Sequence, residues 1–253
     1  MKGESLLILP GWGSNSLRWQ RVKELLEKKG IEVLVLDLPG FGVAFSPQKA
    51  WSRDDYINWI FQKVKDYNPP AAQQGKLYNN WQKFNLLGHS FGGGLAVKLA
   101  ANFSEKVDKL ILLSPAIIRR KSIKTYLFYY ISELGKKVFS LPGFKILHPL
   151  AEKLIYKLAG TRDYYLADGI MKETMKKIGK EEPLEMILEK IKIPTLILWG
   201  ERDDVLPVKD AYYIKEKISD SELKIIPKAK HSPHRESPEE LAGIIVQFIK
   251  GPT

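Results

Sequence analysis

The stretch Leu86-Leu87-Gly88-His89-Ser90-Phe91-Gly92-Gly93-Gly94 places one serine and four glycines directly after an apolar run. It contains the pattern G-x-S-x-G, which is typical of a sharp turn between a strand and a helix. Such a turn projects the serine oxygen from the carboxyl end of the strand, and the small flanking residues avoid clashes around its strained backbone. Ser90 would then begin a helix, whose free N–H groups favour a developing negative charge. A five-residue G-x-S-x-G pattern also fits an ordinary glycine-rich turn. Whether Ser90 is a reactive nucleophile therefore depends on partner residues elsewhere in the chain.

Six short apolar runs, each bounded by turn residues, predict buried strands at residues 5–9, 32–36, 84–87, 109–113, 195–199 and 222–226. Between most of them apolar positions recur every three or four residues, which predicts helices at 19–27, 54–65, 93–102, 209–217 and 238–248. Nearly all-apolar strands that alternate with helices indicate a parallel sheet covered on both faces. We therefore expect an α/β fold with a mostly parallel sheet of about six strands flanked by helices.

The alternation stops between residues 116 and 192, where we predict no strand but apolar residues keep helical spacing. Pro183 opens a further short helix in this segment, at a position where its missing N–H costs nothing. We expect residues 1–115 and 193–253 to form the core domain, and residues 116–192 to form an inserted helical lid.

Composition limits the class of protein. A chain of 253 residues, 44% of them hydrophobic, can bury the core of one large domain. The chain has no cysteine, which excludes disulfides, thiolate metal sites and cysteine nucleophiles. Because we find no signal-peptide pattern and no apolar run of about 18 residues, we expect a cytoplasmic protein without a membrane span.

The net charge of +11 raises nucleic acid, a membrane surface or an anionic substrate as partners. Arg119-Arg120-Lys121 forms a compact basic cluster, whereas most other charges are interleaved with acids, as on solvated helix faces. No nucleic-acid-binding motif accompanies the charge, so we expect no nucleic-acid partner. The sequence leaves open whether the protein is a monomer or a homodimer.

Two further segments supply the partners that Ser90 needs. Glu201-Arg202-Asp203 follows the fifth predicted strand, and Lys230-His231 follows the sixth. Serine, acid and histidine therefore occur in the chain order expected of this turn. Since the carboxyl ends of parallel strands lie at one edge of a sheet, we expect the three side chains at the edge where α/β sheets bind ligands.

With these residues the chain resembles the α/β hydrolases from about residue 6 to residue 248, most weakly through the insertion. Further segments that carry the resemblance are Leu9-Pro10-Gly11-Trp12-Gly13, Asp37-Leu38-Pro39-Gly40-Phe41-Gly42, Ile193-Pro194-Thr195-Leu196 and His231-Ser232-Pro233-His234-Arg235-Glu236-Ser237-Pro238. The resemblance implies Ser90 as nucleophile, Asp203 as the orienting acid and His231 as the base. It also implies that the backbone amides of Trp12 and Phe91 form the oxyanion hole. This mechanism needs no metal and no organic cofactor.

Two residues depart from the family pattern. Pro10 stands where the family usually has histidine, and Lys230 stands where it usually has glycine. Pro10 keeps the backbone amide of Trp12 available but restricts Leu9 to extended geometry. We expect the ammonium group of Lys230 to point into solvent rather than toward His231. Too few residues precede the first predicted strand for the family's first two strands, so we expect six strands rather than eight.

Other acids and histidines compete for the same roles. We expect Asp204 to be solvated or bonded within its own loop, and Asp37 to form a turn. Spacing alone leaves His234 as a rival of His231, and the resemblance favours His231. Structural roles are expected for the two remaining histidines, His89 and His148.

The leading hypothesis is a carboxylesterase that cleaves small-molecule esters of small or medium apolar acyl or alkyl groups through an acyl-enzyme. The candidate substrate-binding side chains are Trp12, which could line the acyl pocket, and Tyr126 and Tyr130 in the aromatic run of the lid. A mostly apolar lid favours uncharged acyl or alkyl groups. Lactone hydrolysis, thioester hydrolysis, C–C bond hydrolysis and acyl transfer use the same triad and stay open. From a different class, this fold also serves as a non-catalytic ligand receptor.

Overall fold

The computed structural model describes residues 4–67, 80–119 and 169–251. These residues contain a six-stranded sheet in the order β2-β1-β3-β4-β5-β6, in which every neighbouring pair is parallel. The strands are β1 (Glu4–Leu9), β2 (Ile31–Val35), β3 (Phe84–His89), β4 (Val107–Leu113), β5 (Thr195–Gly200) and β6 (Ser221–Ile226). The expected α/β fold with about six parallel strands is confirmed.

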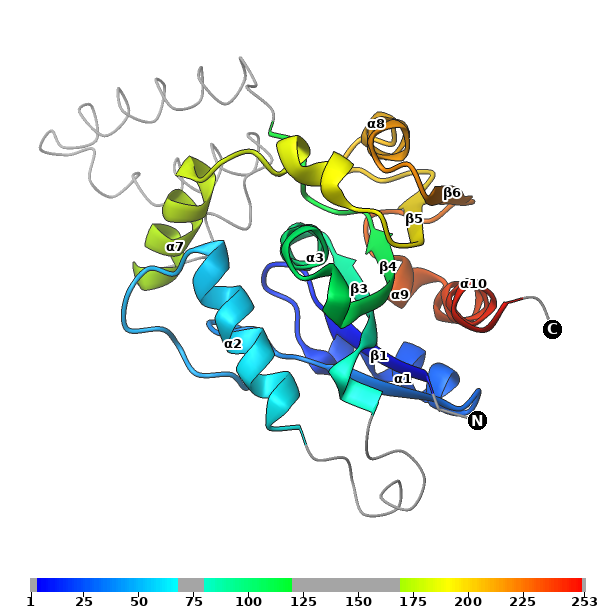
Figure 1. Cartoon of the computed structure of the whole chain (residues 1–253), viewed down its shortest axis with the longest axis horizontal. Coiled ribbons are helices and arrows are strands. Elements are labelled where there is room, and N and C mark those ends of the chain that lie inside the picture. The colour runs from blue at the N-terminus through cyan, green and yellow to red at the C-terminus, as the bar shows by residue number, and fades with distance from the viewer. Residues whose placement is uncertain (1–3, 68–79, 120–168, 252–253) are drawn as a thin grey trace, which may run out of the picture.

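Helices cover both faces of the sheet (Figure 1). α1 (Gln20–Glu27) and α10 (Pro238–Lys250) pack on one face. On the other face lie α2 (Arg53–Lys65), α3 (Phe91–Asn102) and α8 (Lys209–Lys217). The remaining helical segments are η1 (Ser16–Trp19), η3 (Asn80–Gln82), η4 (Ser104–Lys106), α7 (Gly169–Lys180), η6 (Leu184–Lys190) and α9 (Pro233–Glu236).

Strand side chains alternate between two hydrophobic cores, because successive residues of a strand point to opposite faces of the sheet. In β4, Leu110 and Leu112 belong to the core beneath α2, α3 and α8, whereas Ile111 and Leu113 belong to the core beneath α1 and α10. All four side chains are fully buried. A strand buried on both faces requires an unbroken apolar run, which is why these strands can be recognised in the sequence.

Part of the predicted lid lies among the described residues, and α7 packs against the start of α2. The backbone N–H of Arg53 donates to Oε1 of Glu181 at 2.8 Å, and its Nη1 donates to Oε2 at 3.0 Å. The backbone N–H of Trp51 donates to Oγ1 of Thr174 at 3.0 Å. The short helix predicted after Pro183 is present as the 3₁₀ segment η6. The division of the chain into core and lid stays a prediction.

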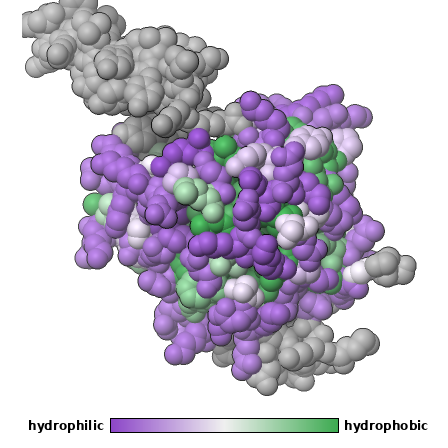
Figure 2. Space-filling model, turned by 45° about the horizontal axis from the view of Figure 1, so that its top comes forward, coloured by the Kyte–Doolittle hydropathy of each residue, from purple (hydrophilic) through white to green (hydrophobic). Residues whose placement is uncertain are grey.

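The surface view in Figure 2 shows one face of the molecule. Hydrophilic residues predominate on this face, and hydrophobic residues form small patches among them. Within the described residues, no helix combines the length and the apolar character needed to cross a membrane.

Candidate active site

Ser90 lies in the tight turn between β3 and α3. Its φ and ψ are 50° and −115°, a conformation that residues other than glycine rarely adopt and that is often found at functional sites. Backbone hydrogen bonds hold the turn: the N–H of Ser90 donates to the carbonyl oxygen of Leu113 at 3.1 Å, and the N–H of Ala116 donates to that of Ser90 at 2.9 Å. The neighbouring strand β4 therefore helps to maintain the strained backbone at the serine.

The second glycine of the G-x-S-x-G pattern makes room for the loop after β1. A Cβ atom at Gly92 would lie only 2.1 Å from the carbonyl oxygen of Leu9, so a larger residue would displace this loop. The same loop carries Trp12, whose ring packs edge to face on that of Phe91 at 5.1 Å between centroids. The two residues expected to supply oxyanion-hole amides thus lie on adjoining segments, one of them next to Ser90.

Asp203 and His231 come from the loops after β5 and β6, and their side chains meet. Nδ1 of His231 lies 2.9 Å from Oδ2 of Asp203, although 28 positions separate the two residues. Oδ1 of Asp203 accepts hydrogen bonds from the backbone N–H groups of Val205 at 2.9 Å and Leu206 at 2.8 Å. Both carboxylate oxygens are therefore occupied, and none of the Asp203 side chain is exposed.

The same hydrogen bonds determine the charge of Asp203. Burial alone would raise the pKa of its carboxyl group, but the hydrogen bonds from His231, Leu206 and Val205 outweigh this effect and hold the pKa below its ordinary value. An ionised carboxylate only accepts, so Nδ1 of His231 donates in this hydrogen bond, which leaves Nε2 as the ring nitrogen that can accept a proton. The pair has the arrangement of an acid that orients a general base.

Gly200 allows the two loops to approach each other. A Cβ atom at Gly200 would lie 2.0 Å from the carbonyl oxygen of Lys230. Next to it, the backbone N–H of Arg202 donates to the carbonyl oxygen of Ala229 at 2.8 Å. The end of β5 therefore lies directly against the loop that carries His231, which brings the Asp203 side chain within reach of the imidazole.

The competing acids have other environments. Asp204 has an exposed side chain, and its Oδ2 lies 4.0 Å from Nζ of Lys230, which is also exposed to solvent as expected. Asp37 accepts hydrogen bonds from the backbone N–H groups of Ser16 at 2.5 Å and Val43 at 2.9 Å, so it joins two loops. In the part of the chain that the structure describes, no group of three or more histidine, aspartate or glutamate side chains could hold a metal ion.

His89 and His234 are buried near His231. The ring of His234 stacks on that of Trp19, with 4.2 Å between centroids and 3° between planes. Nε2 of His89 lies 2.8 Å from the carbonyl oxygen of His231. Burial lowers the pKa of His89 to about 3 and that of His234 to about 2, so both rings are neutral at pH 7. Of the two rival histidines in this loop, the one bonded to Asp203 is His231.

An aromatic cluster beside Ser90 was not predicted from the sequence. The ring of Trp12 packs on Phe41 at 4.8 Å and on Phe91 at 5.1 Å, Phe91 packs on Tyr56 at 5.4 Å, and Tyr56 packs on Trp51 at 5.0 Å between centroids. Four of these residues are partly exposed, and Tyr56 is buried. An aromatic residue in the loop after the second strand, Phe41, was the signal that could have indicated this cluster. The other substrate-binding candidates, Tyr126 and Tyr130, lie outside the described residues.

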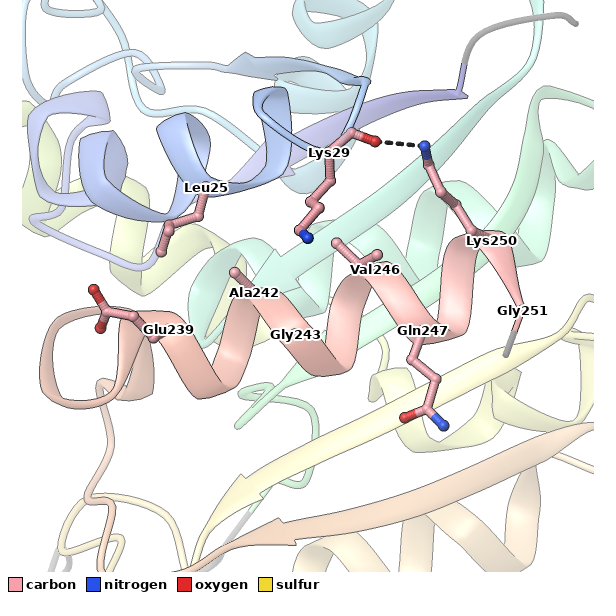
Figure 3. Close-up of a pocket in the computed structure, with 9 residues that line it drawn as sticks. All are labelled: Leu25, Lys29, Glu239, Ala242, Gly243, Val246, Gln247, Lys250 and Gly251. Carbon is pink, nitrogen blue, oxygen red and sulfur yellow. Dashed lines mark hydrogen bonds between the residues drawn. The ribbon is translucent and has the colours of Figure 1, made fainter. Parts of the chain in front are cut away.

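A groove of about 600 Å³ lies elsewhere, between the end of α1 and α10 (Figure 3). Nζ of Lys250 donates to the carbonyl oxygen of Lys29 at one end of the groove. The other lining residues are Leu25, Glu239, Ala242, Gly243, Val246, Gln247 and Gly251. None of the candidate catalytic residues contributes to this groove, so it is separate from the site around Ser90.

Residues 3–238 match the family model described as "Serine aminopeptidase, S33". The chain is 26% identical to a 2-hydroxy-6-oxo-6-(2'-aminophenyl)hexa-2,4-dienoic acid hydrolase from Metapseudomonas resinovorans, over 98% of this chain and 84% of that protein. It is 24% identical to a pimeloyl-[acyl-carrier protein] methyl ester esterase from Nitrosospira multiformis, over 98% and 95% respectively. A similar solved structure is an esterase from Exiguobacterium antarcticum, with a TM-score of 0.70 and 25% identity over 98% of this chain and 92% of that one.

Proposed function

Because this chain belongs to the α/β-hydrolase family described as "Serine aminopeptidase, S33", we propose that it is a serine carboxylesterase with Ser90 as its nucleophile. The observation that carries the proposal is the hydrogen bond between Asp203 and His231, at the sheet edge where Ser90 adopts its strained conformation. A buried acid bonded to Nδ1 of a histidine is what a serine nucleophile requires.

In the proposed reaction, Nε2 of His231 accepts the proton of the Ser90 hydroxyl while Oγ attacks the acyl carbon of the ester. The tetrahedral intermediate then collapses, and the alcohol leaves with the proton from His231. Water attacks the resulting acyl-enzyme as His231 accepts one of its protons, and release of the carboxylic acid restores the Ser90 hydroxyl. Asp203 keeps the imidazole in its tautomer and stabilises the imidazolium that forms in each step.

The backbone N–H groups of Trp12 and Phe91 are the proposed donors to the oxyanion. The N–H of Phe91 belongs to the first turn of α3. N–H groups in this turn have no acceptor within the helix and lie at the positive end of the helix dipole. Across residues 4–67, 80–119 and 169–251, neither N–H is bonded to a backbone acceptor. Losing one oxyanion donor of this kind typically lowers the rate by on the order of 10²–10³.

The aromatic cluster supports an apolar substrate. Trp12, Phe41 and Phe91 are partly exposed residues whose rings pack edge to face in one cluster, and Phe91 adjoins the nucleophile in the chain. Such an apolar cluster favours an alkyl or aryl group over a sugar or a phosphate. We therefore propose esters of small to medium apolar acyl or alkyl groups as the substrate class.

C–C bond hydrolysis is the second candidate reaction. The similarity to the 2-hydroxy-6-oxo-6-(2'-aminophenyl)hexa-2,4-dienoic acid hydrolase favours this reaction, and that similarity covers 98% of this chain. The same Ser90, His231 and Asp203 would serve both reactions, so the substrate pocket decides between them.

The test is hydrolysis of p-nitrophenyl esters, from acetate to palmitate, by the wild type, Ser90→Ala and the control Ser104→Ala. Ser104 lies in η4 and is exposed. We expect Ser90→Ala to lose a factor of at least about 10³ in kcat/KM and Ser104→Ala to equal the wild type. Full activity of Ser90→Ala would reject the proposal. Turnover of a phenyl-substituted oxo-dienoate, with none of any ester, would favour the second candidate.

A further inference from the structure

His89 directly precedes the proposed nucleophile, and its side chain contacts the backbone of the proposed base. It is only 4% exposed, and its Nε2 lies 2.8 Å from the carbonyl oxygen of His231. Since a carbonyl oxygen can only accept, Nε2 of His89 carries the proton in this hydrogen bond. The residue next to Ser90 therefore donates a hydrogen bond to His231 itself.

The second ring nitrogen agrees with this tautomer. Nδ1 of His89 is buried and has no hydrogen-bond partner among the described residues. It faces the loop after β1 so closely that a Cβ atom at Gly11 would lie 3.0 Å from it. A neutral ring with its single proton on Nε2 needs no hydrogen-bond acceptor opposite Nδ1, whereas an N–H at Nδ1 would be left buried without a partner.

Aromatic rings pack around His89. The ring of His234 lies 4.8 Å from that of His89, and the ring of Trp19 lies 6.0 Å from it, both in edge-to-face arrangements. Trp19 is fully buried and His234 nearly so. Close-packed neighbours of this kind hold a side chain in one rotamer. The donor Nε2 is thus fixed in direction by its surroundings.

We infer that His89 is a positioning residue, which sets the separation of Ser90 and His231 through its hydrogen bond to the His231 carbonyl oxygen. The inference rests on the proposed function and adds a residue to it. Asp203 orients the imidazole of His231, whereas His89 locates the backbone from which this imidazole extends. Because a displacement of about 1 Å in a catalytic group can cost on the order of 10² in rate, this contact affects turnover.

Two substitutions separate the hydrogen bond from the packing. In His89→Gln, the side-chain amide extends about as far as Nε2 and can still donate, whereas His89→Met fills similar space without a donor. For His89→Met we expect kcat to fall on the order of 10²-fold with KM within about twofold of the wild type. The kcat of His89→Gln should be at least about tenfold higher than that of His89→Met, and urea unfolding should show that the two variants are equally stable. Unchanged kcat in His89→Met, or no recovery in His89→Gln, would overturn the inference.

A spectroscopic measurement tests the same contact without turnover. The chain has four histidines, so long-range ¹H–¹⁵N spectra of the imidazoles can be assigned residue by residue. We expect the wild-type His89 ring as the Nε2–H tautomer, and ring signals of His231 that shift in His89→Met and return in His89→Gln. An Nδ1–H tautomer of His89 would overturn the inference whatever the enzyme hydrolyses. The expected spectra in a protein that hydrolyses no ester would instead reject the proposed function alone.

Discussion

Asp203 and Asp204 are adjacent in the chain but have opposite environments. Asp203 has no exposed side-chain surface and lies 2.9 Å from Nδ1 of His231. The side chain of Asp204 is 65% exposed, and its nearest ion-pair partner is the Lys230 ammonium at 4.0 Å. One position along the loop thus separates a buried acid bonded to an imidazole from an acid exposed to solvent.

This contrast predicts unequal effects of the same substitution. In Asp203→Asn the amide can donate to Nδ1 of His231 and favours the wrong tautomer, so kcat should fall on the order of 10⁴-fold. Asp204→Asn removes an exposed ion pair that contributes about 0–1 kcal/mol and should leave kcat within about twofold. Steady-state kinetics on one p-nitrophenyl ester measures both. Equal losses in the two variants would show that Asp203 has no special role.

Phe41 should influence the choice of acyl group. Removing its ring in Phe41→Ala opens space beside Trp12, so the preferred p-nitrophenyl ester should shift toward longer chains, by at least about tenfold in the ratio of kcat/KM values. Phe103→Ala is the matched control, because Phe103 packs on Phe61 at the far end of α3. The prediction is wrong if Phe41→Ala and Phe103→Ala give the same chain-length profile as the wild type.

Acid should destabilise the protein through its buried histidines. Burial lowers the pKa of His89 to about 3 and that of His234 to about 2, whereas the ordinary value is 6.5. Between these values the unfolded chain binds protons that the folded chain does not. Stability is therefore full above pH 6.5 and falls as the pH decreases, by about 1.4 kcal/mol per pH unit for each such histidine.

His234→Phe tests this linkage, because phenylalanine keeps a ring on Trp19 but binds no proton. Between pH 7 and about pH 4.5, urea unfolding should show a smaller loss of stability in His234→Phe than in the wild type. The difference should approach about 1.4 kcal/mol for each pH unit below 6.5. An identical loss in both proteins would mean that His234 is protonated in the folded state.

Two glycines should respond differently to a methyl group. Gly92→Ala places a Cβ atom 2.1 Å from the Leu9 carbonyl oxygen, so it should displace the loop that carries Trp12 and lower both kcat and stability. Gly243→Ala, in the middle of α10, has nothing within 4 Å of the added atom and should stabilise the protein by about 0.5–1 kcal/mol. Urea unfolding and ester hydrolysis measure both variants. Tolerance of Gly92→Ala would contradict the packing argument.

The sheet could be predicted from the sequence because its strands are buried on both faces. In β4 the run from Leu110 to Leu113 must be apolar at every position, and such a run is visible without a structure. The order of Ser90, Asp203 and His231 was equally visible, since each follows a predicted strand. The choice of Asp203 over Asp204 and of His231 over His234 needed a family resemblance. Neighbouring residues in one loop differ by only a few positions in their distance along the chain from the other candidate catalytic residues, so spacing does not separate them.

The contacts around these residues could not be predicted. The hydrogen bond from His89 to the His231 carbonyl oxygen joins positions 142 apart in the chain. The stack of Trp19 on His234 joins residues that lie even further apart in the chain. No local periodicity reports such contacts, because they depend on how closely the loops approach at the carboxyl edge of the sheet. The pairing of Trp12 with Phe41 was hidden for the same reason.

Covalent labelling tests whether Ser90 is a nucleophile activated by His231. The protein is treated with a fluorophosphonate and digested, and the modified peptide is identified by mass spectrometry. We expect one adduct per chain, on Ser90, which is absent from Ser90→Ala, forms much more slowly in His231→Ala and forms normally in Ser104→Ala. An unlabelled Ser90 in a protein that hydrolyses esters, or an adduct on another serine, would contradict the account.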